Sequence, residues 1–393
     1  MKRNLLLFVA CAGIALANSY TLEEAFKNGS FSGDIGTYFE DRHVTEGRQT
    51  QYYSNTSWAV GSIALNYQTD LLYNLRFATG FRGSAPFYED DENFMTAHGR
   101  GDASERIYRD DRVLLSRLYV EYSSGGTAIR IGRQPINTDW MTKINDTIRI
   151  TSTSVRNLKI DIIWSRARGR AYLKEMFGFQ RTNPKQNHSG VANVGITYKF
   201  NDFFSLKGYG LHAESIFHGA GAKAMLDFPA NRELTFGALA HFAMSDEKHS
   251  RDLGSVAEGQ VYLKFLGTKL ALAYVQSGRK IGRGSLGITG DLITPFEEGD
   301  VMYARDTSTV YGLLSTSIDN LSIAAAYGTT EYKRQRTPTL DDDKNYRQSE
   351  LSIWLNHAFT RHFKGLLTYD RTFKAQPGYP SLTQVSVGMS YSF

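Results

Sequence analysis

The sequence has little cysteine, little proline and no long apolar run. Cys11 is the only cysteine among 393 residues, and there are only 8 prolines. Cys11 lies in the N-terminal stretch that we expect to be removed, so the mature chain would have no disulfide and no thiol chemistry. The longest apolar stretch, residues 5–16, is shorter than the about 20 residues that a membrane-spanning helix needs. No linker divides the chain into domains.

The chain has no large excess of charge of one sign and no recognisable catalytic motif. Lys and Arg total 45 against 40 Asp and Glu, and this mild excess does not favour a nucleic-acid partner. The 9 histidines are scattered, and the chain has no GxSxG motif, no HExxH motif and no metal-ligand spacing. We therefore expect no enzyme, no catalytic residue, no metal and no cofactor.

The N-terminus has the pattern of a secretory signal peptide. Lys2 and Arg3 precede the apolar run 5–16, and Ala15-Leu16-Ala17 is a small-x-small cleavage site. We predict a signal peptide over 1–17, followed by a periplasmic leader over 18–29 that is loose or forms a short helix at 22–26. The alternative is a lipidated Cys11, which follows Phe8-Val9-Ala10.

What the chain has in abundance is strict alternation of apolar and polar residues. In the segment YNLRFATGFR, 73–82, Tyr73, Leu75 and Phe81 share one face, while Arg76 and Arg82 share the other. Successive side chains of a strand point to opposite faces, so this strand would have one apolar and one cationic wall. About eighteen such segments are expected, near 30–41, 54–67, 71–83, 111–123, 127–134, 147–156, 158–166, 191–200, 204–214, 219–228, 233–244, 255–266, 268–278, 306–317, 321–332, 347–359, 363–374 and 381–393.

The connections between these segments alternate between short turns and long loops, and we expect the long loops on the outer side near 84–110, 167–190, 279–305 and 333–346. Outer-membrane barrels have short periplasmic turns and longer extracellular loops. The sequence therefore predicts an all-β fold, a transmembrane antiparallel β-barrel over 30–393 with about 18 strands, 16 being the alternative. A barrel of that size leaves an aqueous channel. A secreted sandwich or propeller is the soluble alternative, but the 40–50-residue repeat of a propeller is missing.

The last segment, QVSVGMSYSF, alternates up to its final residue. A closed barrel must pair its last strand with its first, because an unpaired strand edge cannot face lipid. The ending MSYSF also resembles the C-terminal signature by which outer-membrane barrels are recognised for assembly. The resemblance implies that Tyr391 and Phe393 form the assembly signal and that the barrel-assembly machinery is a partner.

A second resemblance points to a family. The stretch IRIGRQPINTDWMTKINDTIRITS, 129–152, resembles the region around the third loop of OprD-type porins, and the leader, strand count and C-terminal Phe extend the likeness over the mature chain. The resemblance implies an outer-membrane porin whose third loop, here 134–146, folds inward. It also implies a ladder of basic residues on one wall and uptake of small carboxylate-bearing solutes.

The strand parity supports a basic wall independently. If the apolar residues of each strand face lipid, the alternating residues between them face the lumen. Two of these are acidic, Glu121 and Asp161. Six are basic: Arg76, Arg82, Arg117, Arg130, Arg149 and Lys159. A lumen lined by one sign of charge concentrates counter-ions, and the planar fork of Arg suits carboxylates. The alternative is that each basic residue pairs with a carboxylate and only stabilises the barrel.

The presumptive third loop carries charges of both signs. Asp139, Lys143 and Asp146 would lie across a constriction if the loop folds inward, whereas an ordinary surface loop is the alternative. We therefore expect passive diffusion of ions and small hydrophilic solutes through a narrowed, partly basic lumen, in contact with outer-membrane lipid and lipopolysaccharide. The sequence leaves monomer and homotrimer open. A barrel hydrolase with a closed lumen and an adhesive barrel without conductance are the other candidates.

Overall fold

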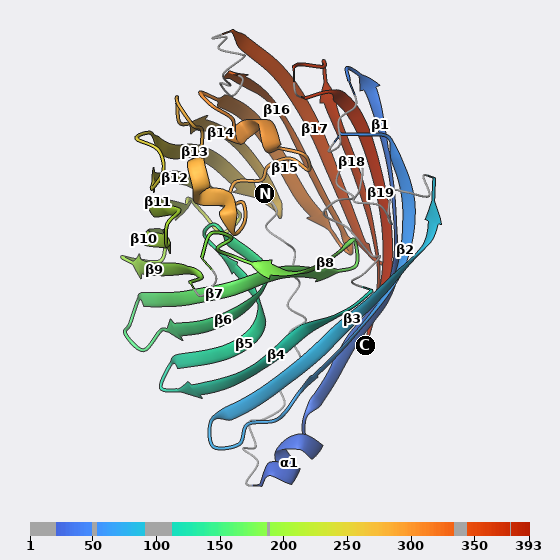
Figure 1. Cartoon of the computed structure of the whole chain (residues 1–393), viewed down its shortest axis with the longest axis vertical. Helices are drawn as coiled ribbons and strands as arrows, with labels where there is room; N and C mark the ends of the chain where they lie inside the picture. The colour runs from blue at the N-terminus through green and yellow to red at the C-terminus, as the bar shows by residue number, and fades with distance from the viewer. Residues whose placement is uncertain (1–20, 49–52, 91–111, 187–188, 334–343, 378) are drawn as a thin grey trace.

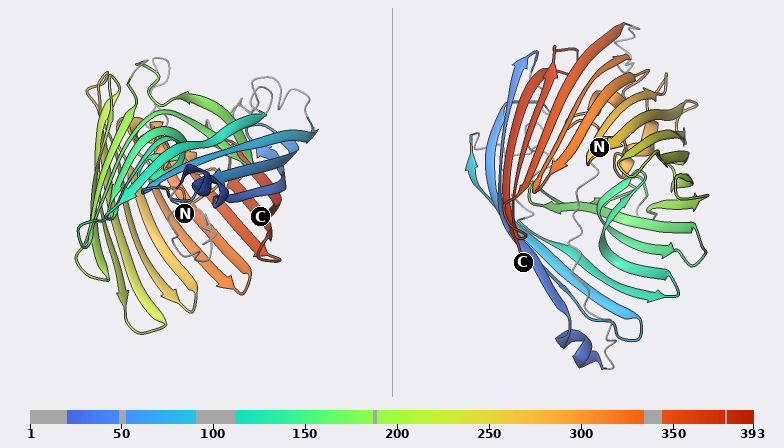
Figure 2. Two further views of the ribbon diagram at one scale, coloured as in Figure 1. Left: turned by 90° about the horizontal axis from the view of Figure 1, so that it is seen from below. Right: turned by 180° about the vertical axis from the view of Figure 1, so that it is seen from behind.

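The computed structural model describes residues 21–48, 53–90, 112–186, 189–333, 344–377 and 379–393. The expected signal peptide and Cys11 lie outside these residues. Within these residues, nineteen antiparallel strands form one sheet, and eighteen of them close into a ring in chain order, with β7 paired to β9 and β19 paired to β1. Figure 1 shows the ring, and Figure 2 shows it from below and from behind. The prediction of an 18-stranded barrel is confirmed, and the alternative of 16 strands is wrong.

The barrel strands begin and end close to the expected segments. They are β1 (Ser30–Glu46), β2 (Thr56–Gln68), β3 (Leu75–Glu89), β4 (Val113–Ser124), β5 (Thr127–Thr138), β6 (Met141–Ser152), β7 (Leu158–Tyr172), β9 (Val191–Lys199), β10 (Phe204–Ala213), β11 (Phe217–Pro229), β12 (Leu234–Glu247), β13 (Leu253–Phe265), β14 (Thr268–Ser277), β15 (Ser308–Ile318), β16 (Leu321–Lys333), β17 (Asn345–Ala358), β18 (Phe363–Phe373) and β19 (Ser381–Ser392).

The alternation of the sequence separates the two faces of the wall. On β12, Phe236 and Phe242 are 51% and 50% exposed on the outward face, whereas His241 and Ser245 are buried on the inward face. A soluble protein would bury such aromatic side chains, but a membrane barrel turns them towards lipid. The alternation therefore places polar chemistry inside the ring.

The chain ends close the ring. β1 and β19 pair from Asp34 opposite Ser392 to Glu46 opposite Ser381. The backbone of Phe393 exchanges two hydrogen bonds with Gly33, at 3.0 and 3.1 Å. The alternation runs to the last residue because that residue belongs to the seam of the barrel.

The described part of the leader is ordered. Helix α1 (Leu22–Lys27) begins with a capping box in which Thr21 and Glu24 satisfy each other's backbone amides. The amide of Asp70 donates to the carbonyl of Ala25 at 2.9 Å, and the ring of Phe26 stacks on Tyr67. The expectation of a loose leader is wrong. The helix lies outside the ring, beside the β2–β3 turn (Figure 2).

Two segments depart from the sequence prediction. The expected loop 134–146 is mostly strand, because β5 runs to Thr138 and β6 starts at Met141. The expected loop after the seventh segment contains an extension of β7 to Tyr172 and an additional strand, β8 (Glu175–Arg181), which pairs only with β7. Both departures concern the interior of the barrel.

Candidate channel constriction

Four strand segments leave the wall together, and we call residues 134–146 and 166–181 the inner flap. Pairing of β5 with β4 ends at Arg133 opposite Leu118, and pairing of β7 with β9 ends at Ser165 opposite Val191. Beyond these points β5, β6, β7 and β8 pair with one another. In Figure 1, β8 lies across the opening of the ring.

A glycine stands at the point where the flap leaves β4. Gly132 has φ +124°, and a Cβ placed there would lie 2.1 Å from the carbonyl oxygen of Leu118. No residue with a side chain adopts this conformation readily, and none fits the space. Gly132 therefore sets the bend that carries the flap into the lumen.

The tip of the β5–β6 hairpin is fixed to the wall formed by β10 and β11. The carboxylate of Asp139 forms ion pairs with Lys207 and with Lys223, the latter at 2.5 Å. Trp140 donates from Nε1 to the hydroxyl of Tyr209 at 2.9 Å. Burial alone would raise the pKa of Asp139, but Lys223 and Lys207 hold that pKa below its usual value. Asp139 is therefore ionised and held by two cations.

The β7–β8 hairpin reaches the opposite side of the barrel. Ala171 and Met176 of the flap pack in one apolar cluster with Tyr38 and Trp58 of β1 and β2. At the turn, Lys174 donates to a carboxylate oxygen of Glu297 at 2.8 Å. The flap is thus held at both of its tips.

Besides the β5–β6 and β7–β8 hairpins of the flap, the β14–β15 connection also enters the barrel. It contains two 3₁₀ helices, η2 (Gly284–Ile288) and η3 (Asp300–Tyr303). Its apolar side chains, among them Leu286 and Phe296, pack in one cluster with Trp140 of the flap. The carboxylate of Glu298 pairs with Arg42 of β1 at 2.6 Å. Expected from the sequence to be an outer loop, 279–305 instead lies against the inner wall, inside the ring in Figure 1.

The other two charges predicted for the constriction loop lie on the flap, and both are paired. Lys143 donates to Glu175 at 2.6 Å. Asp146 accepts two hydrogen bonds from Arg133, at 2.7 and 2.9 Å, and the Arg133 guanidinium lies over the ring of Phe179. Asp139, Lys143 and Asp146 were expected to lie across an open constriction. Each of them instead forms a direct ion pair.

The six predicted wall residues all occupy inward positions, and three of them are paired. Arg82 forms a two-point contact with Asp34 at 2.6 and 2.7 Å, and Arg149 forms one with Asp161 at 2.6 and 3.0 Å. Arg130 pairs with Glu121. For these three arginines the structural alternative holds.

The other three basic residues have no carboxylate partner within the part of the chain that the structure describes. Arg117 and Lys159 form no ion pair there, and Arg76 lies 2.9 Å from the side-chain oxygen of Gln68 when that amide is oriented to accept. Such side chains keep their charge available to ions in the lumen.

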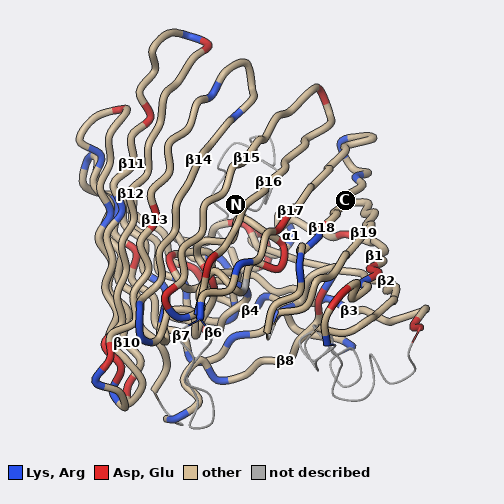
Figure 3. The backbone as a smooth tube through the Cα atoms, turned by 90° about the horizontal axis from the view of Figure 1, so that it is seen from above, with Lys and Arg blue, Asp and Glu red and all other residues tan. Residues whose placement is uncertain are grey.

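The register arranges these residues in two transverse rows. Arg76, Glu121, Arg130 and Arg149 are successive cross-strand neighbours on β3 to β6. Lys159, Thr197, Lys207, Lys223 and His241 are successive neighbours on β7 to β12. Figure 3 shows positions of both signs on the strands and on the segments that cross the interior. In both rows basic residues outnumber carboxylates.

Several basic residues of the interior were missed. Arg170 donates to Glu175 at 3.1 Å, and Lys207 and Lys223 hold the hairpin tip. The run RARGR, 166–170, continues the alternation of β7 and could have signalled a longer strand. Lys207 and Lys223 share the inward parity of their strands, but only the folded chain brings Asp139 to them.

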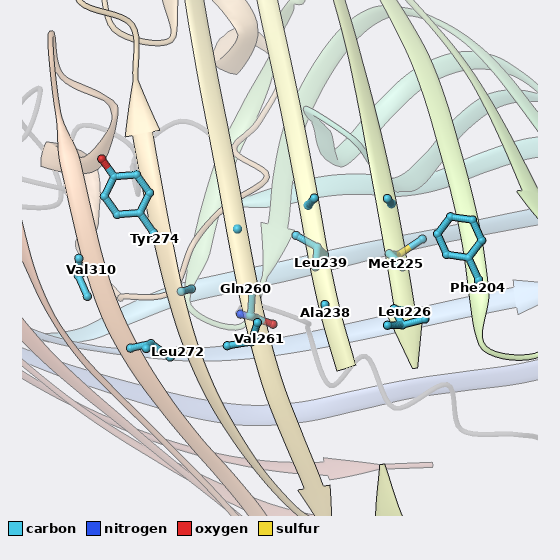
Figure 4. A pocket seen from close by; sticks show the side chains of 14 residues that line it. Phe204, Met225, Leu226, Ala238, Leu239, Gln260, Val261, Leu272, Tyr274 and Val310 are labelled. Carbon is cyan, nitrogen blue, oxygen red and sulfur yellow. The ribbon is translucent and has the colours of Figure 1, made fainter. Parts of the chain in front are cut away.

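A shallow apolar groove lies on the wall of β10 to β15, away from the constriction. Its floor has small residues such as Ala238 and Gly259, and Phe204, Leu226 and Tyr274 flank it (Figure 4). Residues of the outward parity dominate its lining, so we attribute it to the lipid-facing band. No helix of the described ranges is long and apolar enough to cross a membrane.

The fold and its inserted segments define a large barrel of the outer-membrane type with a narrowed interior. Residues 49–236 match the model of a family described as "Putative outer membrane protein". None of the curated protein sequences is significantly similar to the chain.

Solved barrels share the fold over nearly the whole chain. The chain is similar to Pseudomonas aeruginosa OprD, with 9% identity, 96% of this chain and 97% of that chain covered, and a TM-score of 0.69. It is similar to P. aeruginosa OccD3 (OpdP), with 12% identity, coverages of 94% and 92%, and a TM-score of 0.69. It is similar to Acinetobacter baumannii OccAB3, with 11% identity, coverages of 93% and 99%, and a TM-score of 0.73. The chain therefore shares the fold of these solved barrels.

Proposed function

We propose that the chain is a porin through which ions and small hydrophilic solutes diffuse passively, with a preference for anionic or carboxylate-bearing solutes. The observation that carries this proposal is the set of three inward basic residues that have no carboxylate partner among the described residues, Arg76, Arg117 and Lys159. An interior lined by an excess of one charge raises the local concentration of counter-ions. The fold shared with OprD and OccD3 supports the channel itself.

The acidic side chains on the other side of the barrel do not offset this preference. Glu350 and Asp370 are 5% and 0% exposed beneath the β14–β15 connection. The carboxylate of Glu350 accepts from the backbone amides of Glu298 and Gly299, and Ser352 donates to Asp370. These groups hold the inserted connection and are shielded from solutes.

Removing two basic residues without a carboxylate partner tests the selectivity. We expect the double variant Arg117→Gln, Lys159→Gln to keep its conductance steps but to lose anion preference, because neither change leaves a described carboxylate unpaired. A unit charge about 8 Å from an ion in water contributes roughly 0.5 kcal/mol, or about a twofold change in local anion concentration per charge. The measurement is the reversal potential of the purified protein in a planar bilayer under a salt gradient.

The matched control is Lys280→Gln, because Lys280 pairs with Asp252 in an exposed position, with its side chain 72% exposed. An unchanged reversal potential in the double variant, or an equal shift in the control, would contradict the basic path. Absence of any conductance in the parent protein would contradict the porin and favour the hydrolase or the adhesive barrel.

Assembly is proposed to depend on the C-terminal aromatic residues. We expect Phe393→Ser to lower the amount of folded barrel in the outer membrane severalfold, through loss of the signal that Tyr391 and Phe393 present on the outward face. Phe359→Ser is the control, since Phe359 is an outward aromatic of similar exposure, 52% against 47%. Heat-modifiable mobility in gels measures the folded fraction. Equal losses in both variants would assign the effect to aromatic burial in lipid.

A further inference from the structure

Two histidines meet on the outward face of the barrel, on the side of the wall opposite to the residues of β10 and β11 that hold the flap. His212 of β10 and His218 of β11 are direct cross-strand partners beside the short turn at 214–216. Both side chains are exposed, and their Nδ1 atoms are 2.9 Å apart. Their rings stack at 4.6 Å between centroids. The proposed porin function uses neither residue.

The pair lies beyond the apolar band, at the loop end of the strands. On the neighbouring strand β12, Phe242 and Met244 are exposed on the outward face, and Asp246 follows them directly opposite His218. The amide of Lys248 donates to the carbonyl of Ile216 at 2.8 Å, which ties the β12 end to the turn. The imidazoles are therefore accessible from the aqueous rim and have a carboxylate beside them.

The two nitrogens lie at hydrogen-bonding distance from each other, and this spacing is also compatible with two ligands of one metal ion. Two imidazole nitrogens that bind a metal at about 2.05 Å are about 2.9 Å apart when the angle at the metal is 90°, and about 3.3 Å apart in a tetrahedral site. The observed distance is 2.9 Å. Square-planar and octahedral ions take nitrogen ligands at 90°, whereas Zn²⁺ prefers a tetrahedron. Exposed imidazoles rotate readily about χ2, so the two lone pairs turn towards a shared ion at little cost.

We propose that His212 and His218 form a two-histidine site for Cu²⁺, and more weakly for Ni²⁺, on the extracellular rim of the barrel. Cu²⁺ stands above Ni²⁺ in the general order of affinities for nitrogen sites. Water completes the coordination, because the described residues contain no group of three or more His, Cys, Asp or Glu placed to hold a metal ion. Asp246 adds a favourable charge and an acceptor for a metal-bound water. The charge of Lys248 opposes it and acts on His218 more strongly than that of Asp246.

The test uses the full mature chain in detergent micelles without a histidine tag, since a tag would itself bind the metal. One equivalent of Cu²⁺ is added, and electron paramagnetic resonance identifies the ligands. We expect a tetragonal Cu²⁺ spectrum with nitrogen splitting in the parent protein. His212→Ala and His218→Ala should each weaken binding by at least about tenfold, because even the loss of an outer partner of a metal ligand costs that much.

His357→Ala is the control, because His357 lies at the turn end of β17, opposite Leu321 of β16 and Gly365 of β18. This variant should bind Cu²⁺ like the parent. Heat-modifiable mobility and bilayer conductance should be unchanged in all variants, which separates a lost site from a lost fold and from a failed porin. Copper bound with only oxygen ligands, equal binding by the His212→Ala, His218→Ala double variant, or an equal loss in the control would overturn the proposal.

Discussion

Replacing Asp139 with asparagine is expected to release the tip of the β5–β6 hairpin and to raise the single-channel conductance. The change leaves Lys207 and Lys223, which are mostly buried against the flap, without their shared carboxylate. Removing one partner of a buried ion pair costs about 3–5 kcal/mol, because the remaining charge stays desolvated. That is enough to favour the undocked tip, so we expect larger and noisier current steps in planar bilayers.

Asp227→Asn is the matched control for this prediction. Asp227 of β11 also pairs with a lysine of another strand, Lys264 of β13, but both side chains are 45% exposed. An exposed pair contributes about 0–1 kcal/mol, so the control should conduct like the parent protein. If Asp139→Asn leaves the conductance unchanged, the tip is held by Trp140 and the apolar cluster, and the ion pairs are dispensable.

Gly132→Ala is expected to lower the stability of the barrel strongly. The added carbon would lie 2.1 Å from the Leu118 carbonyl oxygen, at a φ of +124° that side chains rarely adopt. Backbone strain alone costs about 1–3 kcal/mol, and the collision with main chain adds to it. We expect the folded fraction to fall sharply in urea titrations followed by heat-modifiable gel mobility.

Gly259→Ala provides the comparison, because a Cβ at Gly259 meets nothing within 4 Å. This variant should unfold at the same urea concentration as the parent. A Gly132→Ala protein of parental stability would mean that β5 leaves β4 by another route than the bend described here.

The wall of the barrel was predictable because it rests on a local rule. Alternation of period two places Phe236 outside and His241 inside whatever the rest of the chain does. The same alternation gives Arg76, Arg117 and Lys159 inward positions. It does not say which arginines have partners, because the contact of Arg82 with Asp34 depends on the register of β1, β2 and β3.

The interior was not predictable by the same rule. The segment 279–305 is rich in glycine and charge, as in a surface loop. Its position is decided by partners far along the chain, among them Trp140, whose carbonyl accepts from Thr289, and Arg42, which pairs with Glu298. A short strand that pairs within its own hairpin and packs against strands distant in the sequence, as β8 does, also carries too weak a local signal to be recognised.

The seam between β1 and β19 sets the order of events in biogenesis. The edge of β1 that Ser392 and its neighbours satisfy stays open until the last strand has been exported. During that interval the first strand is free to pair with other chains, and closure over such a sequence separation is slow. A chain truncated before β19 would therefore have two unpaired strand edges, on β1 and β18. We expect such a chain to aggregate or be proteolysed in the periplasm and not to form an open channel.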